Sequence, residues 1–210
     1  KDATEFKLWA PISEKVHLHI KSRVYPLERQ KRGTWHTQVA GDLEGQSYFY
    51  LHKINGKWVE VHDPYALSSD ANSFVIDQNK IKKPIHRAKT QVKPTDAIIY
   101  EMSVRDFSMQ KEAGFSQPGK FNSLTESPEI DGHYFGLQYL QDLGVTHVQL
   151  MPLYDFGSVD EKHPELVYNW GYDPVQYNVP DGSFATNPHD PYNRIFELQQ
   201  AIETYHQADI

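Results

Sequence analysis

A run of seven residues at positions 168–174, YNWGYDP, combines side chains that could hold a sugar. Its three aromatic rings could pack on the C–H face of a pyranose, while its amide and its carboxylate could form hydrogen bonds with hydroxyl groups. Gly171 adopts backbone conformations closed to other residues, so it could turn the chain and direct Trp170 and Tyr172 into one cavity. The spacing fits equally well a loop that packs its own rings together, and it leaves both alternatives open.

Other groups that could perform acid–base or metal chemistry are scattered along the chain. The spacing of Glu101, Asp106 and Asp155 suggests no catalytic pair, so we expect these carboxylates to support strand ends and loops. Four histidines lack the spacing that places two ligands on one helix face: His133, His147, His163 and His189. Asp155, Asp160 and Glu161 could offer oxygens to calcium, but no spacing fixes such a site. We therefore predict no metal site and no required cofactor.

Residues 1–88 read as short strands separated by turns. Apolar and polar residues alternate with a period of two, most clearly over 16–20. The pair Asn55-Gly56 is a strong hairpin turn signal between aromatic, β-prone runs at 48–54 and 58–61. These patterns predict a small immunoglobulin-like β-sandwich of six or seven strands. The segment 77–96 is polar and basic without periodicity, which indicates a linker or crossover.

From residue 97 the pattern changes to alternating strands and helices. The apolar run 97–100 indicates a strand buried on both faces of a parallel sheet. Apolar residues at helical spacing over 134–143, followed by Gly144, predict a helix that ends there. A second apolar run, 145–150, predicts the next buried strand. Strand, helix and strand in this order form one βα repeat.

The remaining segment predicts the continuation of this repeat. A long loop at 152–191 precedes a helix over 192–206, with Asp190 and Pro191 at the N-cap and first-turn positions. Residues 208–210 resemble the opening of a third strand. Because the long loops follow the strands, the pattern favours a (β/α)8 barrel with an elaborated catalytic face, although open doubly wound sheets share this asymmetry.

Composition and charge exclude several classes of protein. The chain has 39% hydrophobic and 23% charged residues, an ordinary globular mixture, and no run approaches 18 apolar residues, so we expect no membrane partner. The net charge of −7 argues against a nucleic-acid partner. The absence of cysteine excludes disulfides and thiolate chemistry. The first residue is Lys1 and no leader pattern follows, so the start is expected to be internal or processed, and the localisation stays open.

The run YNWGYDP resembles the signature of type I pullulanases, debranching enzymes of glycoside hydrolase family 13. Further segments match the same family in the expected order: FKLWAP at 6–11, DPYA at 63–66, IIYEMSVRDF at 98–107, LGVTHVQLMP at 143–152, DFGSVDE at 155–161 and residues 187–198. The first two resemble the carbohydrate-binding module of family 48 that precedes these barrels. The resemblance therefore predicts a family 48-like sandwich over 1–88 and, over 89–210, the first part of a TIM barrel that stops at the start of strand 3.

This resemblance also implies a chemistry and a set of substrate-binding residues. In the family, the tyrosine matching Tyr172 stacks under the sugar in subsite −1, and Asn169, Trp170 and Asp173 would lie around the same pocket. The implied reaction is retaining hydrolysis of α-1,6 branch linkages in pullulan, amylopectin or glycogen-type glucans. The nucleophile, the acid/base and the third acidic residue of the family lie on later strands. We therefore expect no catalytic residue in this chain, and no cleavage by it alone.

Two alternatives and one physical consequence remain. Residues 1–88 could act as an α-glucan-binding module without catalysis, with Trp9, Trp35 and Trp58 as candidate platforms, although Trp9 and Trp35 occupy positions typical of a sandwich core. The chain could also resemble an isoamylase or a branching enzyme. Finally, two strands of a barrel leave a parallel edge open, so we expect residues 97–210 to be unstable or aggregation-prone in isolation.

Overall fold

The structure, a computed structural model, describes residues 1–88 and 93–210. The chain divides into two compact units, Lys1–Asp77 and Gln78–Ile210, and each is described by itself below. The sequence places the boundary between its two domains at residue 88, directly before residues 89–92, which lie outside the described residues. That domain assignment stays a prediction.

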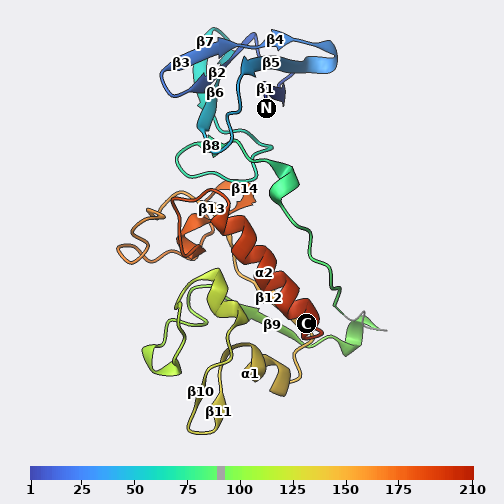
Figure 1. The fold of residues 1–210 in the computed structure, drawn as a ribbon, viewed down its shortest axis with the longest axis vertical. Helices are drawn as coiled ribbons and strands as arrows, with labels where there is room; N and C mark the ends of the chain where they lie inside the picture. The colour runs from blue at the N-terminus through green and yellow to red at the C-terminus, as the bar shows by residue number, and fades with distance from the viewer. Residues whose placement is uncertain (89–92) are drawn as a thin grey trace. The chain divides into compact units, whose positions relative to one another are not determined.

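The first unit consists of two antiparallel sheets (Figure 1). One sheet has the order β1-β5-β4, and the other has the order β3-β2-β6-β7 with β8 beside β6. The strands are β1 (Ala3–Trp9), β2 (Lys15–Ile20), β3 (Arg23–Pro26), β4 (Glu28–Arg29), β5 (Thr34–Ala40), β6 (Ser47–Ile54), β7 (Lys57–Val61) and β8 (Ser73–Phe74). The predicted sandwich is therefore observed, and β3, β4 and β8 are short strands that the patterns did not reveal.

Alternation along these strands builds the core of the first unit. Leu18 and Tyr50 have no exposed surface, and they pack with inward-facing neighbours of both sheets. Asn55 and Gly56 have φ angles of 50° and 75°, which is the conformation of a type I′ turn, so the predicted hairpin is confirmed. Trp9 contradicts the expectation of a core position: it alternates with the buried Leu8 and is 58% exposed.

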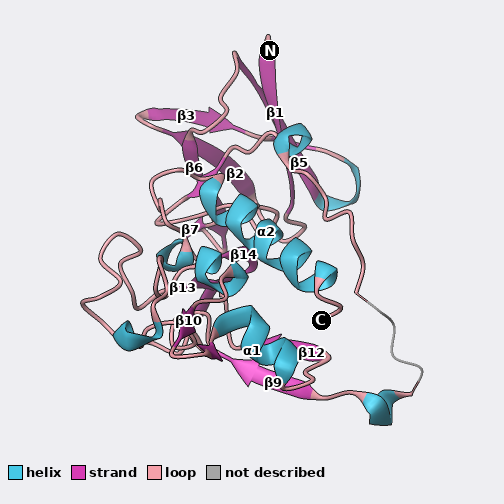
Figure 2. Cartoon of the chain, turned by 60° about the horizontal axis from the view of Figure 1, so that its bottom comes forward, coloured by secondary structure: helices cyan, strands magenta, loops and turns pink. Residues whose placement is uncertain are grey.

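In the residues that the structure describes, the second unit contains one parallel strand pair and two α-helices (Figure 2). β9 (Ile99–Met102) pairs with β12 (His147–Leu150), and the connection between them runs through the hairpin β10 (Glu129–Ile130) and β11 (His133–Tyr134) and then α1 (Gly136–Asp142). The hairpin β13 (Tyr154–Phe156) and β14 (Pro174–Pro180) and the helix α2 (Asn193–Gln207) follow. The predicted strand–helix–strand repeat is thus present.

Short 3-10 helices link these elements: Lys31–Gly33, Gln78–Lys80, Pro94–Asp96, Lys111–Ala113, Phe121–Thr125 and Gly182–Phe184. In the second unit, side chains from several of these pieces complete the core. Phe121, Leu140 and Tyr205 belong to one buried cluster, which also receives Met102 from β9. Most of this core therefore comes from helices and loops, with the strand pair on one side.

Four details of the second unit differ from the sequence-based expectations. The long loop predicted over 152–191 contains β13, β14 and a 3-10 helix. Ile98 and Ile99, expected to be buried on both faces of a sheet, are 52% and 63% exposed, because β9 has a strand neighbour on one side only among the described residues.

The remaining two differences concern the last helix. Its N-cap is Tyr192, two residues later than predicted, and the Asp190 carboxylate instead accepts a hydrogen bond from the Tyr192 amide at 2.9 Å. Residues 208–210 form a turn rather than a strand, with Asp209 at φ 60°. Ile210 is nevertheless buried against the core of this unit.

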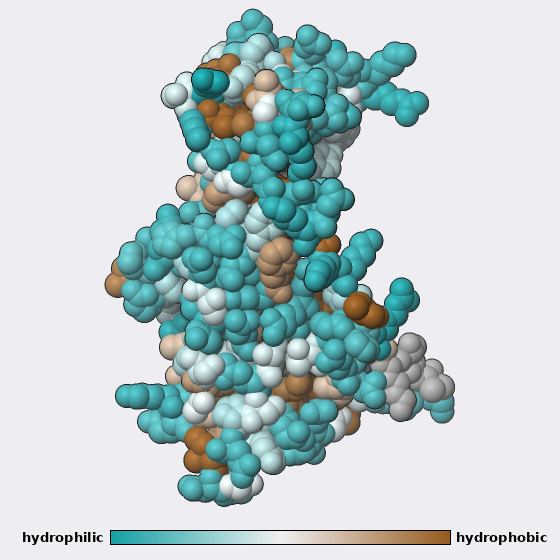
Figure 3. All heavy atoms as spheres, viewed as in Figure 1, coloured by the Kyte–Doolittle hydropathy of each residue, from teal (hydrophilic) through white to brown (hydrophobic). Residues whose placement is uncertain are grey.

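The face drawn in Figure 3 is predominantly hydrophilic, with apolar residues gathered in small separate patches. Neither α-helix described in the structure is both long enough and apolar enough to cross a bilayer.

Candidate functional site

The loop that carries the YNWGYDP run is held together by its own polar side chains. Asn169 acts twice: its Oδ1 accepts a hydrogen bond from the Gly171 amide at 2.8 Å, and its Nδ2 donates to Asp173 Oδ1 at 2.9 Å. The Ser158 hydroxyl donates to Asp173 Oδ2. These hydrogen bonds, that from Ser158 above all, hold the pKa of Asp173 below its usual range. The loop is therefore closed on itself and tied to the turn after β13.

A second set of contacts fastens the start of this loop to the segment that follows β9. The Tyr168 hydroxyl donates to Asp106 Oδ2 at 2.6 Å, and this carboxylate raises the pKa of Tyr168. Arg105 pairs with Asp106 at 2.7 Å, and its guanidinium lies 4.9 Å from the centre of the Tyr168 ring. Asp106 thus acts as a loop support, as expected from the sequence. The loops after two neighbouring parallel strands meet at this point.

Gly171 sets the direction of the two aromatic rings beside it. Its φ of 85° lies in the left-handed region, and a Cβ there would approach both the Cβ and the carbonyl oxygen of Pro152 to 3.0 Å. Trp170 and Tyr172, on either side, remain 60% and 62% exposed. The rings therefore do not form an internal aromatic core. They stand on a loop held by hydrogen bonds, with much of their surface exposed.

The four predicted substrate-binding residues thus fall into two pairs, which differ in whether their side chains are exposed or already hydrogen-bonded within the loop. Tyr172 and Trp170 present exposed rings, whereas Asn169 and Asp173 already use their polar atoms to fold the loop. The roles of all four toward a sugar stay predictions. The supporting partners Ser158 and Asp106 could not be paired with the loop from sequence, because they lie 15 residues from Asp173 and 62 from Tyr168.

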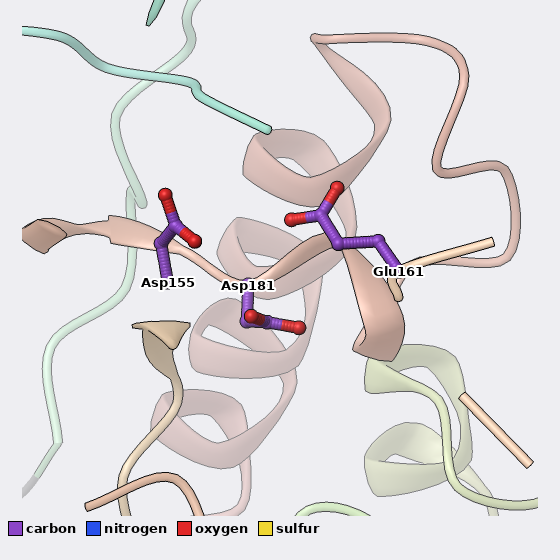
Figure 4. A group of neighbouring side chains, drawn as sticks. All are labelled: Asp155, Glu161 and Asp181. Carbon is purple, nitrogen blue, oxygen red and sulfur yellow. The ribbon is translucent and has the colours of Figure 1, made fainter. Parts of the chain in front are cut away.

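Behind this loop, three buried carboxylates lie close together (Figure 4). Asp155, Glu161 and Asp181 each offer an oxygen, and these oxygens lie within 4.8 Å of one another. Arg194 has no exposed surface, and its two terminal nitrogens donate to the two oxygens of Glu161 at 2.7 and 2.6 Å. One buried guanidinium therefore already compensates part of the charge in this cluster.

Asp181 has a folding role in addition to its place in the cluster. Asp181 accepts hydrogen bonds from the amides of Ser183 and Phe156 at 2.8 and 3.2 Å, and so ties β13 to the 3-10 helix after β14. Burial raises the pKa of Asp181 to about 6 and that of Glu161 to about 7, with Arg194 opposing the shift at Glu161. The residues that share the cluster differ from the calcium candidates of the sequence, because Asp160 is not in it and Asp181, for which the sequence carries no signal, is.

The sequence is similar to a known family of modules and to known enzymes. Residues 1–66 match the family model of carbohydrate-binding module 48, the isoamylase N-terminal domain. A pullulanase from Bacillus subtilis (strain 168) is 40% identical over 218 residues, which cover 98% of this chain and 30% of that enzyme.

Two solved structures extend this similarity to the fold. Pullulanase from Anoxybacillus sp. LM18-11, complexed with maltotetraose, superposes with a TM-score of 0.92 at 42% identity, covering 100% of this chain and 32% of that one. Pullulanase from Paenibacillus barengoltzii, in complex with maltohexaose and α-cyclodextrin, gives a TM-score of 0.88 at 37% identity over 100% of this chain and 35% of that one.

The chain spans about a third of the length of these relatives. The resemblance to pullulanases that the sequence predicts is confirmed, since the chain is similar over its whole length to part of these glycoside hydrolases and its first 66 residues match carbohydrate-binding module 48.

Proposed function

We propose that this chain is part of an α-glucan debranching enzyme that hydrolyses α-1,6 linkages in pullulan, amylopectin or glycogen-type glucans with retention of configuration. In this proposal, residues 89–210 supply the first strands of a (β/α)8 catalytic barrel. The similarity to pullulanases supports it, as does the parallel pair β9–β12 joined through α1. The segments after both strands are long and carry the candidate site, which is the arrangement of a barrel's catalytic face.

The observation that carries the proposal is the folded loop with two exposed rings. Tyr172 stands beside a glycine that cannot be replaced without strain, on a loop tied down by Asn169 and Asp173. An exposed ring that is already held in place can stack under a pyranose with little loss of conformational entropy. Its electron-rich face would then lie beside the positive charge that develops on the sugar during cleavage. We assign this role to Tyr172 and place Trp170 at the edge of the same pocket.

The catalytic carboxylates of this reaction are proposed to lie outside the 210 residues. Retaining hydrolysis needs a nucleophile and an acid/base about 5 Å apart across the scissile bond. Two carboxylates near the exposed rings, Asp106 and Asp173, are occupied by Tyr168, by Ser158 and by Asn169. We therefore propose that the chain alone binds glucan without cutting it. The proposal includes no required cofactor and no nucleic-acid or membrane partner.

A function limited to glucan binding by the sandwich is the second candidate. Trp35 is 4% exposed and its Nε1 donates to the Ala10 carbonyl, so it cannot act as a platform. Trp9 and Trp58 are 58% and 43% exposed, and they keep this candidate open. An isoamylase or a branching enzyme is the further alternative within the same family. Asn169 and the Tyr172-Asp173-Pro174 ending favour pullulanase over these.

The proposal is tested by calorimetric titration with maltotetraose. The variants Tyr172→Ala and Tyr177→Ala are compared in a background that also carries Trp9→Ala and Trp58→Ala, so that the sandwich tryptophans do not contribute. Tyr177 is a suitable control because it is 70% exposed in the same unit but lies on β14. We expect Tyr172→Ala to weaken binding at least about tenfold, from the loss of one stacked ring, and Tyr177→Ala to leave it unchanged.

The outcomes separate the two candidates. Equal affinity for both variants would contradict the assignment of Tyr172, and no binding at all in this background would favour glucan binding by the sandwich. A reducing-end assay on pullulan completes the test. Release of reducing ends by the parent chain would contradict the placement of the catalytic carboxylates outside these residues.

A further inference from the structure

The second unit contains a half-buried lysine, Lys120, that lines a cavity of about 600 Å³. It lies in the connection after β9, directly before the 3-10 helix Phe121–Thr125. The cavity has an apolar part, formed by Met109, Pro118, Pro164, Phe184 and Pro188. Because Lys120 keeps part of its surface exposed, small molecules can reach it from solvent through this cavity.

The backbone on both sides of Lys120 is fixed. The Gly119 amide donates to the buried Ser108 hydroxyl at 2.7 Å. The Lys120 carbonyl oxygen accepts hydrogen bonds from the amide and the hydroxyl of Ser123 at 3.0 and 2.7 Å. The next residue, Phe121, has no exposed surface and belongs to the core. The lysine side chain therefore projects into the cavity from a segment that cannot move away from it without unpacking the core.

The amine of Lys120 has an uncharged hydrogen-bond partner. Its Nζ donates to the Ser183 carbonyl oxygen at 2.7 Å. No carboxylate of the residues that the structure describes forms an ion pair with it. A half-buried ammonium normally requires such a partner, because burial removes the water that would otherwise stabilise its charge. The surroundings of Lys120 thus stabilise the charged form of the amine poorly.

The charged groups around the cavity do not supply the missing partner. Three acids are committed elsewhere: Glu161 to Arg194, Asp181 to the amides of Ser183 and Phe156, and Glu197 to the Thr186 amide at 3.0 Å. Glu165 lines the cavity but is exposed, and its carboxylate lies 3.6 Å from His163. Two further cations line the cavity, Arg105 and Lys162, and they disfavour another positive charge.

This environment favours the neutral amine, which is the nucleophilic form. Burial lowers the pKa of Lys120, and the attraction of the surrounding acids, Glu197 first, opposes the shift only in part. An ordinary exposed lysine has roughly one neutral amine in two thousand at pH 7. A desolvated lysine has more, and enzymes use such lysines to form imines with carbonyl compounds. Lys120 therefore has the surroundings of a nucleophilic amine.

The geometry points to a covalent modification site at which the amine of Lys120 condenses with small aldehydes that enter the cavity. The nitrogen attacks the carbonyl carbon, its two protons pass to the carbonyl oxygen, and that oxygen leaves as water while a carbon–nitrogen double bond forms. The step is reversible and needs no oxidant or reductant. When the imine is protonated, its one N–H can still donate to the Ser183 carbonyl oxygen. The inference does not depend on the proposed function.

The chain contains a matched control in the same connection. Lys111 lies in the 3-10 helix Lys111–Ala113, and its side chain is exposed. Cleavage after glutamate separates the two lysines, because residues 102–112 contain only Lys111 and residues 113–126 contain only Lys120. The two amines can therefore be compared within a single sample, at the same reagent concentration and pH.

The test treats the whole chain with propanal and cyanoborohydride at pH 7. The reductant adds hydride to the imine carbon and so converts each imine into a stable secondary amine. Mass spectrometry of the two peptides over time gives the labelling rates. We expect Lys120 to be labelled at least about fivefold faster than Lys111. Lys120→Arg, which keeps the positive charge, should remove the fast phase of label uptake by the intact chain.

A second pair of variants tests whether the missing carboxylate causes the reactivity. Met109 is 43% exposed and lines the cavity, and its Sδ would lie 3.0 Å from a Cβ built on Gly119. Met109→Glu places a carboxylate beside Lys120 and should slow its labelling at least about threefold, because an opposite charge favours the ammonium. Met109→Gln has nearly the same shape without the charge and should leave the rate unchanged. Thermal melts establish that both variants are folded.

Two results would overturn the inference. The first is labelling of Lys120 in the folded parent chain that is no faster than labelling of Lys111. The second is fast labelling of Lys120 that Met109→Glu does not slow relative to Met109→Gln. If Met109→Glu does not fold, the comparison of Lys120 with Lys111 in the parent chain still decides the question.

Discussion

The two units differ in how their cores are closed. In Lys1–Asp77, two antiparallel sheets face each other, and side chains such as Leu18 and Tyr50 are completely buried between them. In Gln78–Ile210, two strands of four residues each form the only parallel pair in the described part, and Ile98 and Ile99, at the start of its first strand, stay more than half exposed. The candidate sugar loop nevertheless has a defined shape. It owes this shape to polar contacts and a buried ion pair rather than to a completed sheet.

We expect the largest difference between the units in the free energy of unfolding that is lost when one partner of an ion pair is removed. Arg194→Met removes the partner of Glu161 in the interior of the second unit and should lower its free energy of unfolding by about 3–5 kcal/mol. The matched change Lys7→Met breaks an ion pair on the surface of the sandwich and should have no measurable effect. Urea unfolding followed in each unit measures both. A small loss for Arg194→Met would mean that loop packing, not the ion pair, holds the second unit.

Because the parallel pair has an open edge, amide hydrogens of the second unit should exchange faster than those of the first unit. We expect amides of β12 from Val148 to Leu150 to exchange at least about a hundredfold faster than those of β6 from Tyr48 to Tyr50, because a short parallel pair opens without unfolding the rest. Mass spectrometry of the deuterated chain resolves both segments. Equal protection in β12 and β6 would contradict the prediction that residues 97–210 are unstable or aggregation-prone in isolation.

A buried acid in the second unit, Asp181, should make the stability of that unit depend on pH. The pKa of Asp181 is about 6 in the folded state, against an ordinary value near 4. The folded state holds the proton of Asp181 more tightly than the unfolded state does, and this stabilises the fold fully below about pH 4. The contribution is lost as the pH rises through 6, and the free energy of unfolding then falls by at most about 2–3 kcal/mol. Asp181→Asn should therefore gain stability relative to the parent chain between pH 4 and 8, in addition to a constant loss from one missing acceptor.

The control for this prediction is Asp160→Asn, in the same segment but exposed. It removes a carboxylate from the surface rather than from the buried cluster, so it should not reproduce the gain expected of Asp181→Asn. Melting temperatures at several pH values supply the comparison. A difference between Asp181→Asn and the parent that stays constant with pH would show that Asp181 is ionised throughout.

We expect the smallest loss of stability from substitutions at two glycines that have positive φ angles. Gly171→Ala must adopt φ near 85° and also crowd Pro152, so we expect a loss of about 2 kcal/mol from the second unit. Gly56→Ala has the same kind of φ in the sandwich hairpin but open space around its Cβ, and should lose only about 1 kcal/mol. Thermal unfolding measures both losses. Equal losses would mean that Pro152 moves away from the added Cβ at no measurable cost in stability.

The sequence predicts the sandwich better than the second unit for a physical reason. Alternation over 16–20 and the Asn55-Gly56 signal are local, and the structure keeps them. The alternation of β1 also places Trp9 outward, against the expectation that a tryptophan joins the core, because Phe6 and Leu8 already occupy the inward positions. Strands of two residues, such as β4, are too short for any alternation to show.

In the candidate site, the sequence indicates which residues could face the sugar but not what holds them. The exposed rings of Trp170 and Tyr172 follow from a local run around a glycine. The contacts from Tyr168 to Asp106 and from Glu161 to Arg194 join residues 62 and 33 apart, and no local pattern pairs them. The hairpin β13–β14 is missed for the same reason, since its register is irregular and its turn spans the whole loop.

The most direct test of the account follows all four tryptophans of the chain at once. With 5-fluorotryptophan incorporated and each resonance assigned by a Trp→Phe variant, maltotetraose is titrated and the fluorine spectrum recorded. The account predicts that the Trp170 resonance moves and saturates, while that of Trp35, 4% exposed in the sandwich core, stays fixed. A Trp170 resonance that does not move at saturating maltotetraose would contradict the claim that the loop beside Tyr172 is a preformed sugar site.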